Sequence, residues 1–374
     1  MKPSTSDLPE GSPAEFSALV SQRKRSAIAL LASLAITLGL VVLTLVLPVP
    51  FVKLAPGPTF NVIGELEGQE VIMINGTETY PTSGTLDMTT VRESGGPRGG
   101  LTFFDAVGSW FNSQDAVVPR ELVYPDDVSG EEVKQRNAAL FSTSESDAVA
   151  AALNYLDLPI TTELVATAVV SDAPADGVFQ PRDEIVSVNG TPVKQPSDVV
   201  QAVQGEPVGT TFDFGIRRAS EDMMVQVTSA PNSANDDKPY IGISVGELYS
   251  ADFDIDFTLQ DVGGPSAGLM FATGIVDKLT PENLNGGGNV AGTGTITPNG
   301  EIGPIGGIRQ KLAGARNTGA ELFLMPRQHC AESQGYVPEG LTVVPVSTLT
   351  EAIEQMQSWA EKRPLASCPL GNPA

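Results

Sequence analysis

The chain has 374 residues, of which 41% are hydrophobic and 18% charged, and a formal net charge of −23 at pH 7. This length predicts one to three domains. The acidic balance argues against a protein that binds nucleic-acid phosphates, because neutralising them requires Lys and Arg, and the sequence has no GxxxxGKS/T loop of the kind that cradles ATP.

One apolar, uncharged segment, residues 26–47, is long enough to span a bilayer at about 1.5 Å per residue. The basic run at 23–25 precedes it, and only Lys53 follows closely. By the positive-inside rule we expect a cytoplasmic tail at 1–25, a transmembrane helix at 26–48, and everything after it outside the cell membrane. The alternative is a cleaved signal peptide. The length of the run and the lack of a small-x-small cleavage site after it disfavour that alternative.

Between the membrane segment and residue 158 we expect short strands and two helices. The expected elements are an extended, proline-stiffened linker at 49–64, strands at 71–74 and 86–91, and helices at 102–111 and 145–156. The second helix is alanine-rich, and Ser144 directly before it is the predicted N-cap.

A compact unit follows at residues 159–231. Its expected elements are strands at 164–170 and 183–188, a tight Asn-Gly turn at 189–190, a helix at 197–203 capped by Ser197, and strands at 211–216 and 223–228. This order and the segment ADGVFQPRDEIVSVNGTPV (175–193) resemble a bacterial PDZ domain. Arg182 departs from the family, which usually has glycine there. Another small α/β module is the alternative.

Beyond this unit we expect a polar linker and two strands. The linker is predicted at 232–239, and strands at 241–245 and 253–259. The second strand alternates apolar and polar residues with period two and leads the chain to Gly263.

Residues 263–268 read Gly-Gly-Pro-Ser-Ala-Gly and place Ser266 before an apolar run that predicts a buried helix. Glycines let backbone amides approach a substrate closely, and a helix N-terminus offers unpaired N–H groups and the positive end of the dipole. Such groups can stabilise an oxyanion. The backbone of Gly264, Pro265, Ser266 and Ala267 is therefore the predicted oxyanion-binding segment. This segment alone fits a nucleophilic serine and a helix-capping serine equally well.

Lys311 is the candidate general base. A helix predicted over 308–315 places Ile308, Leu312 and Ala315 on one face, and Lys311 leans toward that face. Desolvation lowers the pKa of an amine in apolar surroundings, and a neutral amine can accept the proton of a serine hydroxyl. The alternative is a surface lysine whose stem packs on apolar atoms while its amine stays in water.

The chain's one histidine, His329, offers a rival base. The GxSxG pattern around Ser266 matches the nucleophile elbow of α/β-hydrolases, with Asp277 or Glu301 as the acid. An elbow requires a strand that runs directly into it, and residues 260–263 intervene. His329 lies in a predicted surface turn. We therefore favour the amine as the base.

Two segments carry a more specific signal. GGPSAGLMFATGIVDKL (263–279) and GTGTITPNGEIGPIGGIRQKLAGARNTGAELFLMP (292–326) resemble the proteolytic domain of Lon-type serine endopeptidases. The resemblance covers residues 256–326 closely. It implies Ser266 as nucleophile and Lys311 as general base.

Two further positions follow from this resemblance. Thr293 occupies the family position that helps to hold the lysine. Gly263 departs from the pattern, because many members carry an acidic residue there. The resemblance therefore implies that a carboxylate that tunes the site is either missing or supplied by another segment.

The whole chain resembles the membrane-anchored, PDZ-containing Lon-like proteases of bacteria, which lack an ATPase module. The resemblance implies an α+β fold in which a PDZ domain is inserted into a discontinuous proteolytic α/β domain. The predicted divisions are 1–25 cytoplasmic tail, 26–48 transmembrane helix, 49–64 linker, 65–158 first part of the protease domain, 159–231 PDZ domain, 232–360 catalytic domain and 361–374 C-terminal tail. The alternative is a separate N-terminal domain followed by the PDZ and protease domains.

The two cysteines, Cys330 and Cys368, fall on the outer side of the membrane in this topology. An oxidising compartment favours a disulfide between them, which would tie the C-terminal tail to the body. Two free thiols remain open, because sequence does not measure their separation.

The predicted function is that of an ATP-independent serine endopeptidase in the cell membrane that cleaves exported or membrane polypeptides. The PDZ domain would bind their C-terminal tails by strand addition. We expect no metal, no cofactor and no nucleic-acid partner, and the family resemblance suggests a ring-shaped homo-oligomer. The alternative is an inactive, membrane-tethered PDZ scaffold, against which the intact Ser266, Thr293 and Lys311 argue.

Overall fold

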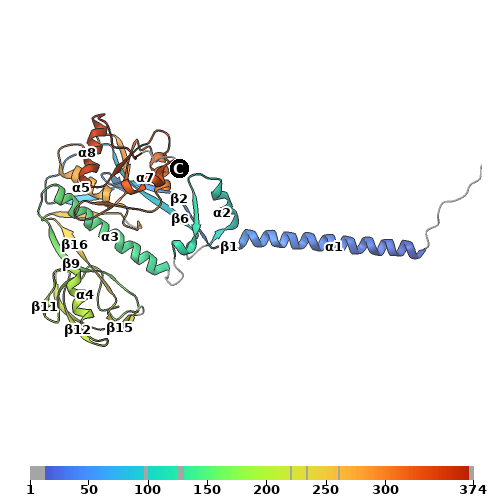
Figure 1. Ribbon diagram of the computed structural model, residues 1–374, viewed down its shortest axis with the longest axis horizontal. Helices are drawn as coiled ribbons and strands as arrows, with labels where there is room; N and C mark the ends of the chain where they lie inside the picture. Colours follow the sequence, from blue (N-terminus) through green and yellow to red (C-terminus); the bar gives the residue numbers. More distant parts are fainter. Residues whose placement is uncertain are drawn as a thin grey trace, which may run out of the picture.

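The computed structural model describes residues 13–96, 100–124, 130–219, 221–232, 235–259 and 262–369. It consists of a long N-terminal helix, a larger α+β body and a smaller body built around its own sheet (Figure 1). Residues 1–12 and 370–374 of the two predicted tails lie outside the described residues.

Helix α1 (Pro13–Val46) extends away from the rest of the molecule (Figure 1). Within it, Arg25–Leu43 is a 19-residue stretch of mean hydropathy 2.5 with none of its surface buried. Length and composition qualify it to cross a membrane, and an N-terminal signal sequence would meet the same criteria. The helix also includes the part of the predicted cytoplasmic tail that the structure describes.

The larger body is organised around a six-stranded sheet. In spatial order its strands are β22 (Thr342–Val346), β21 (Leu322–Pro326), β18 (Asn289–Gly292), β6 (Thr85–Ser94), β2 (Phe51–Asn61) and β8 (Ala116–Pro119). The first four strands are parallel, and β2 runs antiparallel to β6 and β8.

The larger body is built from two chain segments, one before and one after the smaller body in the sequence. Strand β6 precedes the smaller body and pairs with β18, which follows it. Likewise β5 (Ile72–Asn75) pairs with β17 (Asp254–Phe257). The sheet therefore cannot form until both chain segments have come together.

Short elements and helices complete the larger body. The strand pairs are β1 (Pro48–Val49) with β7 (Leu101–Thr102), β3 (Glu65–Leu66) with β4 (Gln69–Glu70), and β19 (Thr295–Ile296) with β20 (Ile302–Gly303). The helices are α2 (Phe103–Trp110), η1 (Arg120–Leu122), α3 (Gly130–Tyr155), α5 (Gly268–Leu279), α6 (Ile308–Asn317), η2 (Arg327–His329), α7 (Cys330–Ser333) and α8 (Leu349–Ala360).

Helix α5 is the centre of the core, as its continuous apolar sequence predicts. Residues 268–278 are all buried. Leu269, Met270 and Ile275 of this helix share one core cluster with side chains from β6, α3 and α8, including Leu86, Met88, Ala148, Ala152, Ile353 and Met356. Ser266, which comes just before α5, is thus attached to a helix that is packed on all sides.

The smaller body has its own sheet and core. The sheet contains β13 (Glu221–Thr228), β12 (Thr211–Arg218), β10 (Glu184–Val188), β9 (Thr161–Val169) and β16 (Ile243–Ser250) in that order, with β11 (Thr191–Pro192) beside β10. Helix α4 (Pro196–Gln204) and the hairpin β14 (Ala230–Asn232) and β15 (Asn235–Tyr240) accompany it. Its core includes Phe179, Ile185, Val199, Phe212, Phe214 and Ile216.

The smaller body joins the larger one through two adjacent strands. Strand β9 pairs with β16 along its whole length, from Thr161 opposite Ser250 to Val169 opposite Ile243. The chain therefore enters and leaves this body side by side, as Figure 1 shows below α3. Strand β16 lies outside the predicted unit at 159–231, although it completes the same sheet.

Most predicted strands are confirmed, but the helix predicted at 145–156 is longer than expected. Helix α3 begins at Gly130. Ser144 is therefore inside the helix and is not its N-cap. Its Oγ donates a hydrogen bond to the carbonyl of Pro265, 3.1 Å away. The hydroxyl therefore makes a tertiary contact and does not cap a helix.

Three other local predictions are wrong. Residues 49–64 do not form a linker, because β2 lies within them and pairs with β6 and β8 in the six-stranded sheet. Helix α4 is capped by Gln195, which forms a reciprocal capping box with Asp198, and Ser197 lies within the first turn. The polar segment predicted as a linker at 232–239 overlaps β14 and β15. Polar composition suits an exposed hairpin as well as a linker, so composition alone did not separate the two.

Arg182 occupies the position where the PDZ resemblance led us to expect glycine. Its backbone has φ of +73°, in the left-handed region that favours glycine. Its N–H donates to the carbonyl of Ala166, and its guanidinium donates to Ser142 Oγ on α3. The arginine therefore adopts the turn at the cost of some strain and contacts the larger body.

Candidate active site

Ser266 lies in the turn between β17 and α5. The N-cap of α5 is Ala267, and no side chain caps the helix. The Ser266 hydroxyl thus does not serve as a helix cap, which was the alternative role open to it. Gly268 follows this turn. A Cβ at its position would lie 2.7 Å from Ile296 Cγ2 and 2.9 Å from Ser144 Oγ. A larger residue there would push the turn away from α3.

The turn is also held by hydrogen bonds from neighbouring elements. The Ser266 carbonyl accepts from the Gly294 N–H at 3.0 Å and from Thr293 Oγ1 at 3.1 Å. On the other side, the N–H of Gly264, which has φ of +88°, donates to the Asn137 carbonyl of α3. These contacts fix the backbone on both sides of the hydroxyl.

Lys311 lies in the first turn of α6 and is only 3% exposed. Its Nζ donates to Thr293 Oγ1 at 3.0 Å, and Thr293 is fully buried. Burial lowers the pKa of Lys311 to about 7. Lys311 is therefore not a surface lysine, and a large fraction of it is neutral near neutral pH.

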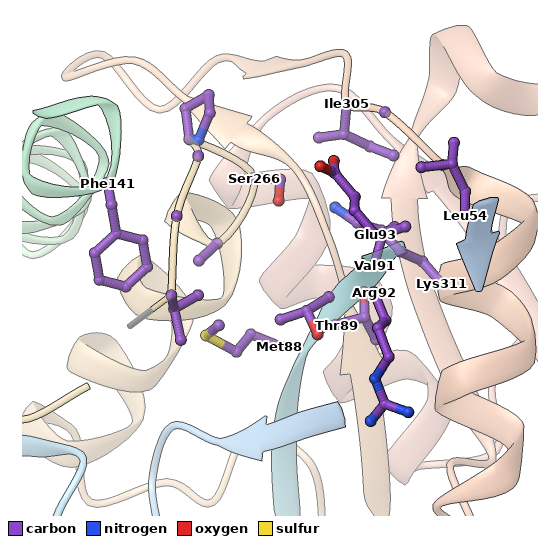
Figure 2. Close-up of a pocket in the computed structure, with 18 of the residues that line it drawn as sticks. Leu54, Met88, Thr89, Val91, Arg92, Glu93, Phe141, Ser266, Ile305 and Lys311 are labelled. Carbon is purple, nitrogen blue, oxygen red and sulfur yellow. The ribbon is translucent and has the colours of Figure 1, made fainter. Parts of the chain in front are cut away.

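Both side chains face one pocket of about 830 Å³ (Figure 2). Its walls include Leu54, Met88, Thr89, Val91, Arg92, Glu93, Phe141 and Ile305. Figure 2 shows the Ser266 hydroxyl entering this space from the turn before α5 and the Lys311 side chain entering it from α6. The two groups are not hydrogen-bonded to each other. Thr293 connects them, because it accepts from the lysine and donates to the serine carbonyl.

The expected oxyanion-binding segment contains two free donors. Pro265 has no N–H, and the N–H of Gly264 is used by Asn137. Within the part of the chain that the structure describes, the amides of Ser266 and Ala267 have no acceptor. They lie at the N-terminus of α5, where the helix dipole favours negative charge.

No carboxylate accounts for the state of Lys311. Burial is the cause of its lowered pKa, and Glu93, which lines the same pocket, accepts a hydrogen bond from the Tyr124 hydroxyl at 2.7 Å. A Cβ at Gly263 would lie 3.0 Å from Asn137 Cβ. Helix α3 thus takes the space into which a side chain at position 263 would extend.

The rival triad does not assemble. His329 is buried, so the prediction of a surface turn was wrong. Its Nε2 accepts from the Ile305 N–H at 2.9 Å, and its Nδ1 lies 3.1 Å from Glu332. It does not line the pocket that contains Ser266. Asp277 is buried near the far end of α5, where it accepts from the Leu284 N–H.

Three contributors to the site were not found from sequence: Asn137, Ser144 and Glu93. The first two come from α3, whose N-terminal half was not predicted as a helix. Glu93 lies at the end of β6, and nothing local distinguishes it from a surface carboxylate. Of the two states that the sequence left open for the cysteines, the structure has the disulfide: Cys330 and Cys368 are bonded, with their Cα atoms 5.4 Å apart.

Two parts of the chain match known protein families. The family model of the Lon protease (S16) C-terminal proteolytic domain matches residues 260–358, and a PDZ domain model matches residues 165–218. The chain thus contains a proteolytic domain of the Lon type together with a PDZ domain.

Individual relatives match the same catalytic region. Lon proteases from Lachnoclostridium phytofermentans and Azospirillum brasilense are 37% and 38% identical over 94 residues, which is 24% of this chain and 11% of theirs. A mitochondrial Lon protease homolog from Debaryomyces hansenii is 33% identical over 96 residues, 25% of this chain and 9% of its own. The chain therefore spans only about a tenth of the length of these relatives.

Among solved structures, the PDZ domain of an SdrC-like protein from Listeria monocytogenes is similar, at 20% identity and a TM-score of 0.21. The match covers 22% of this chain and 86% of that one.

Proposed function

We propose that the protein is a membrane-anchored serine endopeptidase that cleaves peptide bonds with a dyad of Ser266 and Lys311. The observation that carries the proposal is the buried, uncompensated amine of Lys311 beside a serine whose hydroxyl has no other role. A general base works best when its pKa lies near the working pH, and burial brings the pKa of Lys311 to about 7.

In the proposed mechanism, Ser266 Oγ attacks the carbonyl carbon of the scissile bond while neutral Lys311 accepts its proton. The amides of Ser266 and Ala267 stabilise the oxyanion. Lys311 then protonates the leaving amine and later activates the water that releases the acyl group. Thr293 holds the amine in place throughout. The absence of a direct hydrogen bond between the dyad members is compatible with this role, because such bonds often tighten only when substrate binds.

The proposed domain arrangement is an inserted PDZ domain in a discontinuous protease domain. Strands β5 and β6 come before the smaller body, and their partners β17 and β18 come after it. The smaller body keeps a separate core. An arrangement with an independent N-terminal domain would not need these pairings.

We further propose that the PDZ domain binds the C-terminal tails of substrates. Strand β16 is one of the two edge strands of its sheet, so a peptide can add beside it. The chain turns into β16 at Gly242, which has φ of +85°. In the described residues the amides of Ile241 and Gly242 have no acceptor. Successive free amides at such a turn suit a terminal carboxylate.

The remaining parts of the proposal concern location and energy. Helix α1 would anchor the protein with residues 1–25 in the cytoplasm and both globular bodies outside. Substrates would then be exported or membrane polypeptides. Because the sequence has no nucleotide-binding loop, the chain would not use ATP and would act on flexible or unfolded segments.

Two substitutions test the dyad. Ser266→Ala and Lys311→Ala should each abolish cleavage of a loosely folded polypeptide, and Ser266→Ala should also abolish labelling by a fluorophosphonate probe. Undiminished cleavage in either variant would exclude the dyad. Blank cleavage and labelling assays with the wild type would instead favour a binding role for the Lon-type domain.

A further inference from the structure

Helix α2 presents its apolar side chains to the outside. Its buried residues are the small Ala106 and Ser109. Four aromatic residues in or directly after the helix are exposed: Phe103 (46%), Phe104 (51%), Trp110 (71%) and Phe111 (88%). A surface helix of a protein surrounded by water normally does the reverse and buries its large apolar residues.

These side chains form one continuous face. At about 100° per residue, positions 103, 104, 107, 110 and 111 fall within an arc of about 120°, and residue 107 is Val. Ala106 and Ser109 lie outside this arc and are buried against the body. The aromatic face is thus a property of the whole helix and not of one stray residue.

The backbone places this face beside the end of the apolar helix α1. Strand β1 begins two residues after α1 ends and pairs with β7, with Pro48 opposite Thr102 and Val49 opposite Leu101. Thr102 is the N-cap of α2. Figure 1 shows α2 next to the point where α1 leaves the body.

The dimensions agree with a membrane boundary at this level. The exposed apolar stretch Arg25–Leu43 has 19 residues and measures about 28 Å at 1.5 Å per residue, close to the hydrocarbon thickness of a bilayer. Its C-terminal end is therefore at the outer interface, the depth at which Trp side chains are enriched and at which interfacial helices bury Trp and Phe. Continuity with α1 favours lipid as the occupant of the aromatic face.

We propose that α2 is an interfacial helix, which docks the protease body on the outer surface of the same bilayer that α1 spans, with Phe103, Phe104, Trp110 and Phe111 inserted among the lipids. This inference rests on the proposed membrane anchor. Helix α2 would add a second membrane contact that fixes the orientation of the body. With α1 alone, the body would be attached to the membrane without a fixed orientation.

Docking has a consequence for the catalytic pocket. Helix α2 leads into β8, and η1 follows β8 directly. Leu122, which is 77% exposed, and Val123 lie at the end of this segment and line the pocket that contains Ser266. The docked body would hold the pocket near the bilayer surface, within reach of segments of other membrane-bound polypeptides that lie close to the membrane.

The two tryptophans allow a direct test, because the chain has only Trp110 and Trp359. Trp359 lies in α8 and packs against the core. The full chain carrying Trp359→Phe is reconstituted into phosphatidylcholine nanodiscs, with bromine atoms placed either high on the acyl chain or near its end. We expect Trp110 emission to shift to the blue and to be quenched most by the shallow bromines. The matched variant Trp110→Phe should show no lipid-dependent quenching of Trp359.

Three outcomes would overturn the proposal. In the first, Trp110 emits as in water and is quenched by iodide but not by brominated lipid. In the second, Trp110 is shielded from both, and light scattering shows several copies per disc, which would make the face a contact between copies of this chain. In the third, Phe104→Ser and Phe111→Ser, both at exposed positions, leave the quenching unchanged.

The test separates docking from anchoring. If the chain fails to enter nanodiscs or is extracted from membranes by alkaline carbonate, the anchor proposed for α1 is wrong. If the chain is anchored and Trp110 stays in water, only docking is wrong.

Discussion

Two buried lysines in successive helices show what distinguishes a candidate base from a structural cation. Lys278 in the last turn of α5 is 7% exposed, and Lys311 in the first turn of α6 is 3% exposed. Lys278 Nζ lies 2.7 Å from the carboxylate of Glu70. Among the described residues, the hydrogen-bond partner of Lys311 Nζ is the neutral hydroxyl of Thr293. Burial is common to both, and the missing counter-charge sets Lys311 apart, because a carboxylate stabilises an ammonium ion.

The largest expected effect is the difference in kcat between variants that lack one or the other of these two amines. Lys311→Met should lower kcat by about 10²–10⁴, the usual contribution of a general base. Lys278→Met should leave kcat close to that of the wild type, because its amine does not face the pocket. Cleavage of a fluorogenic unfolded polypeptide at saturating substrate measures both. Equal losses would show that burial, and not the site, decides the effect.

The pH dependence of the wild type should follow the pKa of Lys311. The amine must be neutral to accept a proton, so kcat/KM should fall about tenfold per pH unit below about 7 and level off above it. Lys278→Met should keep the same profile. A rate that stays flat from pH 5 to pH 8 would argue against Lys311 as the base.

Stability should respond in a related way. The pKa of Lys311 is lower in the folded state than in the unfolded chain, so burying the charged amine destabilises the fold fully below pH 7, and this penalty is lost as the pH rises toward 10.5. Lys311→Met in a Ser266→Ala background, which prevents self-cleavage, should therefore raise the free energy of unfolding by a few kcal/mol at pH 6.

Denaturant titration over the same pH range measures that gain. The difference between Ser266→Ala and the double variant should shrink between pH 7 and pH 10. A constant difference would mean that lost packing, and not charge burial, accounts for it.

The smallest expected effect comes from introducing a carboxylate into the pocket that Gly263 and Lys311 both line. Gly263→Asp should move the midpoint of the pH profile upward by less than about one unit, because a negative charge favours the ammonium form of Lys311. Gly263→Asn is the matched control, since it crowds Asn137 equally and adds no charge. An identical shift in both variants would point to displacement of α3 and not to charge.

Predictions from sequence succeeded where a signal is local. The period-two alternation before Gly263 predicts β17, and the apolar run after Gly268 predicts the buried helix α5. The spacing of Lys311 along its helix predicts that it turns inward, and it is buried. In each case neighbouring residues in the chain create the pattern, so no distant contact is needed to find it.

Predictions failed where a distant segment supplies the stabilising contact. The first half of α3 has little apolar periodicity, but Phe141 packs edge-to-face on Phe271, and the carbonyl of Asn137 accepts from Gly264. His329 sits in a polar sequence and is nevertheless buried, because the Ile305 amide and Glu332 satisfy its ring.

The sequence by itself determined the chemistry that is available: one serine in a glycine-rich turn, one lysine on an apolar helix face, and an apolar helix at the N-terminus. Only the tertiary structure decided what these groups can do. It removed Lys311 from water without giving it a carboxylate, joined it to Ser266 through Thr293, and turned the aromatic face of α2 outward beside α1. Desolvation and the choice of partners depend on segments that are far apart in the chain, and those are properties of the packed molecule.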